Sequence, residues 1–419
     1  MAQFSTSRNS LLNNNNDIYE VVMVSGQAGP SIYVPAGNLN SSADAFGRQR
    51  VSEPFTLFDH SFRYGDNPEK WKSKTIGTAS VAHNLDQGLM DLTIGTGSGD
   101  KVIRETAKVL QYQPGKSLLT MNTFVMGAAV PNVRMRIGYF GKENGFYVER
   151  EGSNNYIVKR SSVSGSIVDT RVAQASWNVD KLDGTGPSGV VLDMSKAHIF
   201  FSDFEWLGVG SVRTGFVIDG QYIITHIFHH ANEIESTYIT TATLPIRYEV
   251  ENLAASTGAT LKQICSTVIS EGGYTALSLT RTASTALTGK NLSDSDFTPL
   301  ISIRLRSGQT DAVVIPTEIS LYGLQQAAYK YALIKNSTLT GASWTFIDSS
   351  SSVEYDIAAI NRTGGTIVKE GFFVGDNKGG ATSEDLRNLN HSLQLSRNII
   401  DADSQGEIFT LAVLSLIHI

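Results

Sequence analysis

The stretch VRMRIGYF at residues 133–140 decides the fold class, together with the turn and the strand that follow it. Its apolar residues occupy every second position, and Arg134 and Arg136 lie between them, which is the period of a strand with one buried face. Asn144 and Gly145 come next and precede the stretch FYVE at 146–149. Because Asn and Gly tolerate positive φ, this pair predicts a tight turn between two antiparallel strands.

A second hairpin follows from the same reasoning. Asp219 and Gly220 separate two apolar stretches that are rich in β-branched residues, so they predict another tight turn. Residues 195–206 and 236–251 also have the composition of strands, and Pro245 in the second of them favours an edge or a bend.

These strands indicate the architecture of the chain. No helical segment of useful length occurs between residues 55 and 253, which predicts an antiparallel jelly-roll (concanavalin-like) β-sandwich over residues 46–253. The 419-residue length favours more than one domain, and we expect a second β-rich domain, again a sandwich, over 254–413. Residues 1–45 are rich in Asn, Ser, Gly and Ala and predict a flexible arm.

Few helices are expected in this all-β chain. Residues 321–334 fit a helix and a strand equally well, because their aromatic and leucine positions also alternate. Residues 383–395 fit a helix, since Thr382 and Asp385 resemble a capping box.

The last six residues, LSLIHI at 414–419, are the peptide that the string CTGTCTCTTATACACATC would encode, and that string resembles a transposase adaptor used in preparing sequencing libraries. We therefore expect residues 414–419 to be a sequencing-adaptor artefact without functional content. The alternative is an ordinary apolar terminal strand over 411–419.

Composition narrows the classes of partner. The formal charge of −6 and the lack of any block of five Lys or Arg residues predict no nucleic-acid binding. The polar first 17 residues lack a secretory signal, and no apolar stretch reaches the roughly 18 residues of a spanning helix. We expect synthesis in a host cytoplasm and no membrane insertion. Cys265, the single cysteine, permits no intrachain disulfide.

Motifs for catalysis and cofactors are weak. The glycines at 95–99 and 208–210 lack the helix and lysine of a phosphate cradle. His226, His229 and His230 form a histidine cluster, but on a strand and without the HExxH pattern, so we expect strand-end histidines and no metal site. The sequence therefore predicts no cofactor, no catalytic residues and no enzyme. Glycosidase chemistry stays an open alternative, because it needs only two nearby carboxylates, but no pair of Asp or Glu residues stands out as its acid and nucleophile.

The polar loop at 176–189 is the candidate ligand site. It combines an aromatic ring with amide and carboxylate groups, which are the groups that contact the apolar face and the hydroxyls of a sugar. The candidate residues are Trp177, Asn178, Asp180 and Asp183. The alternative is a purely structural loop, in which Trp177 closes the end of the sandwich.

A set of motifs resembles a family of virion structural proteins of marine and environmental tailed bacteriophages, used as tail, fibre or capsid-associated proteins. The motifs are FGR at 46–48, VSEPFTLFD at 51–59, YQPGKS at 112–117, the loop at 176–189, WLGVG at 206–210 and LPIRYE at 244–249. The resemblance implies a non-enzymatic virion component. Together with the N-terminal arm and the strand edges of an open sandwich, it leads us to expect a homo-oligomer that docks other virion proteins. Two alternatives stay open: a carbohydrate-binding host-receptor module of a tail fibre, and a depolymerase of host polysaccharide.

Overall fold

The computed structural model describes residues 9–12, 18–21, 53–274, 280–285, 289–309, 312–323, 325–376, 380–386, 394–395, 400 and 406–416. Strands dominate these residues, and the helix among them is a single 3₁₀ turn, η1 (Gln174–Ser176). Within the same ranges, no helix is long and apolar enough to cross a membrane.

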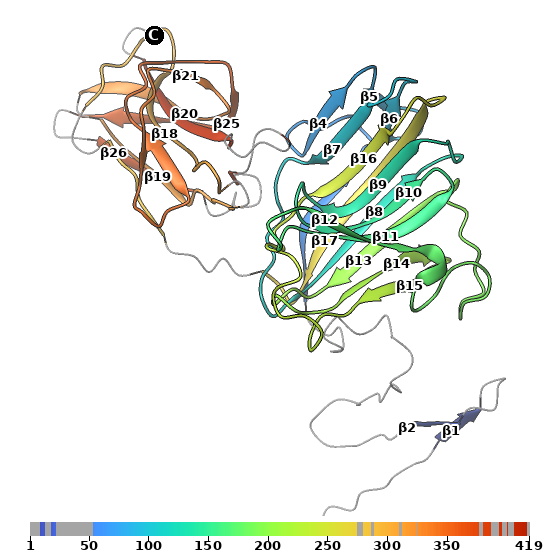
Figure 1. Ribbon diagram of the computed structural model, residues 1–419. Coiled ribbons are helices and arrows are strands. Elements are labelled where there is room, and N and C mark those ends of the chain that lie inside the picture. The colour runs from blue at the N-terminus through green and yellow to red at the C-terminus, as the bar shows by residue number, and fades with distance from the viewer. Residues whose placement is uncertain are drawn as a thin grey trace, which may run out of the picture.

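Two large antiparallel sheets form the first sandwich (Figure 1). The seven-stranded sheet runs in the order β12 (Val168–Ala173), β11 (Asn154–Ser161), β10 (Gly145–Glu151), β9 (Val133–Phe140), β16 (Ile246–Asn252), β7 (Lys101–Thr106) and β4 (Trp71–Ile76). The eight-stranded sheet runs in the order β15 (Gln221–Phe228), β14 (Val212–Ile218), β13 (Ala197–Phe204), β8 (Ser117–Val125), β17 (Ala259–Glu271), β6 (Leu89–Ile94) and β5 (Ser80–Asn84), and β3 (Pro54–Ser61) pairs with β17. The chain therefore has the predicted jelly-roll, concanavalin-like fold.

Both predicted hairpins are confirmed, with one shift. Asp219 and Gly220 have φ of 51° and 75° and connect β14 to β15 in a two-residue turn. The turn between β9 and β10 spans residues 141–144 instead, and Gly145 is the first residue of β10. Gly145 is required there because a Cβ atom would lie 2.3 Å from Cα of Phe140. Of the expected strand at 236–251, only the part after Pro245 forms, as β16.

The core of the first sandwich lies between its two sheets and is rich in aromatic side chains. Tyr139, Phe146 and Phe204 are fully buried, and the ring centroid of Phe204 lies 5.4 Å from that of Tyr139 and 5.5 Å from that of Phe146. The hydroxyl oxygen of Tyr139 lies 2.8 Å from the carbonyl oxygens of both Leu110 and Ala242, so its single proton has two acceptors within reach. A buried tyrosine is tolerated because its hydroxyl has partners.

The second body is also built from strands. Its six-stranded sheet runs in the order β22 (Trp344–Phe346), β23 (Val353–Asp356), β18 (Thr298–Leu305), β27 (Ile408–Ser415), β20 (Ala327–Lys335) and β25 (Thr366–Gly375). Two short pairs accompany it, β19 (Glu318–Gly323) with β26 (Gly380–Asp385) and β21 (Thr338–Thr340) with β24 (Asn361–Thr363). Ile319 and Leu321 of β19 share a buried core with Tyr331 and Leu333 of β20.

Three expectations differ from the structure. The boundary at 253/254 falls too early, because β17 pairs with β3, β6 and β8 and so completes the first sandwich. Of residues 321–334, the expected helix or strand, 321–323 end β19 and 327–334 belong to β20, whose alternate side chains are buried on one side of its sheet. The helix expected at 383–395 is replaced by β26 up to Asp385, and most of its remainder lies outside the described residues.

The two ends of the chain are described only in part. Within the expected arm, β1 (Asn9–Leu12) pairs antiparallel with β2 (Ile18–Val21), and the rest of residues 1–45 lies outside the described residues. At the other end, Leu414 and Ser415 extend β27 opposite Lys330 and Tyr329. Residues 417–419 lie outside the described ranges, and the adaptor origin of 414–419 stays a prediction.

Candidate functional site on the seven-stranded sheet

Charged side chains line the outer face of the seven-stranded sheet, where three neighbouring strands carry them at every second position. They are Arg134 and Arg136 of β9, Glu149 and Glu151 of β10, and Glu249 and Glu251 of β16. The register places Arg136 directly opposite Glu149 on one side and Glu249 on the other. Opposite charges in facing positions stabilise antiparallel strands. The intervening residues point into the core, so the period of two creates this face.

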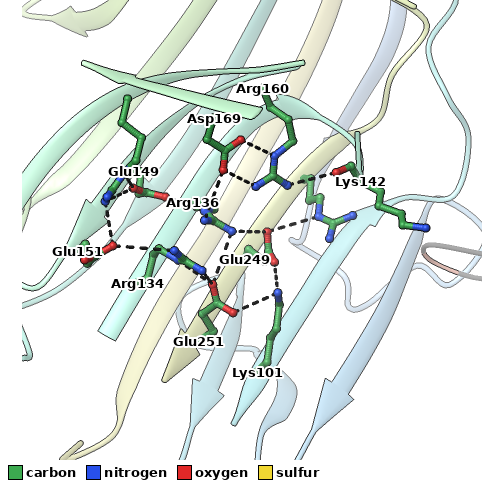
Figure 2. Close-up of polar contacts among 12 residues, drawn as sticks. Lys101, Arg134, Arg136, Lys142, Glu149, Glu151, Arg160, Asp169, Glu249 and Glu251 are labelled. Carbon is green, nitrogen blue, oxygen red and sulfur yellow. Dashed lines mark hydrogen bonds and ion pairs between the residues drawn. The ribbon is translucent and has the colours of Figure 1, made fainter. Parts of the chain in front are cut away.

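Neighbouring strands extend this arrangement into a network of ion pairs, which we call the charged face (Figure 2). Its cations are Lys101, Arg134, Arg136, Arg160, Arg171 and Arg247, and its carboxylates belong to Glu105, Glu149, Glu151, Asp169, Glu249 and Glu251. Six positive and six negative groups balance, so the network carries no net charge.

Arg136 is the centre of the charged face. Its Nε donates to Oε2 of Glu149 at 2.7 Å, and its Nη1 lies 3.5 Å from Oε1 of Glu251 and 3.8 Å from Oε2 of Glu249. The guanidinium group lies 5.5 Å from the ring centroid of Tyr147, and only 7% of the side chain is exposed. A buried cation with several carboxylates around it is held in one position.

The outer members of the network reach the surface. Arg171 donates from Nε to Glu149 at 2.6 Å and from Nη2 to Glu151 at 2.8 Å, and the side chains of Arg171 and Glu151 are each 33% exposed. Arg160 forms a two-pronged pair with Asp169, at 2.7 and 2.8 Å. Bidentate pairs fix the plane of the guanidinium group. The accessible donors and acceptors are thus attached to buried, immobile partners.

Two buried or half-buried carboxylates of this network, Glu249 and Asp169, stay ionised. Burial opposes the charge of Glu249, but Arg247, Lys101 and Arg136 outweigh it and lower the pKa of that carboxyl to about 2. Asp169 behaves alike, because the hydrogen bond from Arg160 outweighs burial and lowers its pKa. Near neutral pH these groups are therefore fixed hydrogen-bond acceptors beside fixed guanidinium donors.

The predicted loop site is arranged differently from the expectation. Trp177 is only 3% exposed, lies in the main core and donates its indole N–H to the carbonyl of Val172 at 3.1 Å. It presents no ring face to solvent. Trp177 therefore closes the end of the sandwich, which is the role that the alternative of a purely structural loop predicts for it.

The three polar residues of the loop site bind backbone groups. The amide of Asn178 accepts from the N–H of Ile227 and donates to its carbonyl, both at 2.9 Å, at the edge strand β15. Asp180 is buried and accepts from backbone N–H groups of Leu182 and Ser188. Asp183 accepts from Thr185 across an exposed turn. These residues are neighbours in the sequence, but their side chains form hydrogen bonds with backbone groups of the loop and of β15. Glycan binding by them stays a prediction.

The histidine cluster is dispersed over separate contacts. His226 accepts from the N–H of Asn178 at 3.3 Å, and Nδ1 of His230 lies 2.6 Å from the carbonyl of Gly210. Burial lowers the pKa of each to about 4, so both are neutral at pH 7. Among the described residues, no group of three or more His, Cys, Asp or Glu side chains is placed to hold a metal ion.

Sequence reasoning missed the charged face. It interpreted Arg134 and Arg136 as ordinary solvent-facing positions, because their partners lie on other strands, Glu251 being 117 residues away. The available signal was the repetition of charge at every second position in three strands, RMR at 134–136, ERE at 149–151 and EVE at 249–251. Complementary patterns of that kind predict neighbouring strands.

Comparisons with known proteins concern the fold alone. No protein-family model and no curated protein matches the sequence. Among solved structures, a protein of unknown function from Shewanella oneidensis MR-1 is 12% identical, with a TM-score of 0.37 over 60% of this chain and all of its own. The Emp47p carbohydrate recognition domain is 9% identical, with a TM-score of 0.34 over 54% of this chain and 99% of its own. A family 16 glycoside hydrolase from Bacteroides ovatus is 8% identical, with a TM-score of 0.34 over 51% of this chain and 99% of its own.

One expectation is corrected by this comparison. The prediction that the chain is not an enzyme is contradicted, because glycoside hydrolases, of families 16 and 43 among others, predominate among the similar structures. We do not retain it. Since the identities are low, the likeness assigns no reaction to this chain and shows only that it has an antiparallel jelly-roll sandwich.

Proposed function

We propose that this chain binds a neutral glycan on the charged face. The observation that carries the proposal is the arrangement of surface donors and acceptors, Arg171, Glu151 and Arg134 among them, on a buried and neutralised centre. Groups held in position by buried partners lose little entropy when a ligand binds. A sugar hydroxyl both donates and accepts hydrogen bonds, so it fits between a carboxylate and a guanidinium group.

Charge balance favours an uncharged ligand. The six cations and six carboxylates of the charged face cancel, so the network itself lacks the net field that draws a polyanion. Lys72 and Lys74 lie on the same side of the sheet, on β4 at its edge, outside the network. Alternating donors and acceptors remain at the rim of the charged face, and these match a chain of hydroxyl groups. The ligand class is therefore a neutral polysaccharide.

We further propose that the chain acts as a component of a tailed-phage virion, as a homo-oligomer that docks other virion proteins. The motifs at 46–59, 112–117 and 206–210 support this role through the resemblance described above. An apolar surface on the second body also supports it: Phe372 and Val374 of the edge strand β25 are each 68% exposed. Exposed apolar edges of this kind are places that subunit contacts cover. Mass spectrometry of purified particles should detect many copies, and absence from particles would remove the virion assignment.

A glycan array tests the binding proposal with three variants of the full chain. Glu151→Gln removes one rim charge while keeping its shape, and we expect a loss of binding of about tenfold or more. Glu143→Gln changes an exposed carboxylate in the turn between β9 and β10 and should leave binding unchanged. Asp183→Asn alters the loop at 176–189. Full binding by Glu151→Gln together with loss in Asp183→Asn would refute the charged face and favour the loop.

A further inference from the structure

A second polar site lies on the opposite side of the same sheet. An open pocket of about 430 Å³ is formed between the edge of the seven-stranded sheet, at β11 and β12, and the segment at 234–238 that follows β15. Pockets of roughly 300–1,000 Å³ suit small molecules. The lining is Lys159, Ser161, Val163, Ser164, Val168, Thr170, Ile234, Ser236, Thr237 and Tyr238.

Lys159 occupies a position where the strand pattern calls for an apolar residue. Ile157, two residues earlier on β11, is fully buried in the core between the sheets, and Lys159 points to that same side. Its neighbour Arg160 points to the charged face instead. Partial burial of an ammonium group costs stability unless the group is paired. A lysine at this position therefore needs a polar partner, and an anionic ligand would supply a stronger one than a neutral group.

The ammonium group of Lys159 has a neutral partner. Its Nζ lies 3.0 Å from Nε2 of His230, whose Nδ1 donates to the carbonyl of Gly210, so Nε2 is the acceptor. The His230 ring stacks on Tyr238 at 3.9 Å, which fixes its orientation. Among the described side chains, no carboxylate lies within 4.0 Å of this ammonium, and the charge of Glu233 acts only from farther away. The ring centroid of Phe228 lies 5.5 Å from the same nitrogen. Lys159 therefore lines the pocket with an ammonium group whose near neighbours are two neutral rings and no carboxylate.

Hydroxyl groups surround that charge. Ser161 and Thr170 lie beside Lys159 on β11 and β12, where Lys159 faces Thr170 directly across the two strands. Ser236 and Thr237 contribute hydroxyl groups from the opposite wall. One uncompensated cation among several hydroxyls fits one negative charge on a hydroxylated ring.

We propose that this pocket binds a sugar unit that carries an anionic substituent, with Lys159 pairing with the anion and the surrounding hydroxyls contacting the ring. Burial lowers the pKa of Lys159, and an anion at hydrogen-bond distance would raise it again, which is the change that binding exploits. The proposal does not depend on the charged face, because Lys159 and Arg160 point to opposite sides of the sheet.

Calorimetric titration of the full chain with glucuronic acid, glucose and sodium sulfate tests the assignment. We expect glucuronic acid to bind and both other probes to bind at least about tenfold more weakly. Glucose or sulfate binding as tightly as glucuronic acid would overturn the acidic sugar, since either the charge or the ring would then be irrelevant. No binding of glucuronic acid would overturn it as well.

Variants locate the binding. Lys159→Met keeps the aliphatic stem and should lose glucuronic acid binding by about tenfold or more, whereas Lys159→Arg keeps the charge and should retain most of it. Lys74→Met, an exposed lysine of the same sheet, is the matched control. Thr170→Val, at an exposed position, should weaken binding without unfolding the chain. Unchanged binding by Lys159→Met with an unchanged melting temperature would refute the site, and Glu151→Gln should not affect it.

Discussion

Replacing Arg136 with Met is the sharpest test of how the charged face is held together. The substitution removes a cation that is only 7% exposed and keeps a side chain of comparable length. It leaves Glu149, which is fully buried, and Glu249, which is nearly so, with one positive neighbour fewer each. Uncompensated buried charge is among the few causes of large destabilisation.

The magnitude follows from the partners that remain. Breaking a buried ion pair by removing one member costs about 3–5 kcal/mol. Glu149 keeps Arg171, and Glu249 keeps Lys101 and Arg247, so we expect the lower end, about 3 kcal/mol. Lys74→Met, which removes an exposed lysine from the same sheet, should change stability by no more than about 0.5 kcal/mol.

Urea unfolding at pH 7, followed by tryptophan fluorescence, measures this difference. Trp71, Trp177 and Trp206 all lie in the first sandwich, so the main fluorescence transition reports on it. Midpoints of that transition should be compared, since a chain with two cores need not unfold in one step. The double variant Arg136→Met/Glu149→Gln should recover about 1 kcal/mol or more, because the unpaired carboxylate is then gone. A single variant as stable as Lys74→Met, or a double variant no better than the single one, would refute the reasoning.

Three further predictions concern stability. Burial lowers the pKa of His226 and His230 in the folded chain to about 4, so between pH 6.5 and 4 only the unfolded chain takes up these protons. The free energy of unfolding should therefore be highest above pH 6.5 and should fall between pH 6.5 and 4 by on the order of 2 kcal/mol for each histidine, after allowance for solvent screening. Thermal melts with the same midpoint from pH 7 to pH 4 would contradict this. Trp177→Ala should cost about 3–5 kcal/mol by thermal melt, since it leaves a cavity in the core, whereas an unchanged midpoint would mean an accessible ring. Gly138→Ala would place a Cβ atom 2.2 Å from the Phe146 carbonyl oxygen and should destabilise the chain by at least about 2 kcal/mol. In the control Gly141→Ala the nearest atom to the new Cβ is 3.7 Å away, so its melting temperature should be unchanged.

The local pattern of the sequence accounts for most strands and turns. The period of two at 133–140 and the Asp219–Gly220 turn act within a few residues, so they can be recognised without the fold. The boundary between the bodies could not be found this way. β17 has a strand pattern that fits either body, and only its pairing with β8 and β3 assigns it to the first. Pairing between distant strands is not encoded in a local period.

The candidate site illustrates the same division. Polar loop residues such as Asp180 attract attention in a sequence because the same groups serve ligands and turns, and here the backbone of the loop takes their hydrogen bonds. Charged residues on strands are not noticed in the same way, because the alternation of polar and apolar residues already explains them as solvent-facing positions. Arg136 becomes informative only when the register brings Glu149 and Glu249 to its two sides.

Adjacent residues of β11 show how pairing separates the two proposed surfaces. Arg160 donates twice to Asp169, and this pair fixes both groups, so a ligand finds them preorganised and already neutral. Lys159, on the other side of the strand, donates to a neutral imidazole and keeps its charge uncompensated. A cation paired with a carboxylate can hold a ligand's hydroxyl group in a fixed geometry, whereas a cation with a neutral partner can still attract an anion. Because both arise from one strand, a neutral ligand on the charged face and an acidic sugar in the pocket are chemically distinct expectations, and a variant of either residue can abolish one while preserving the other.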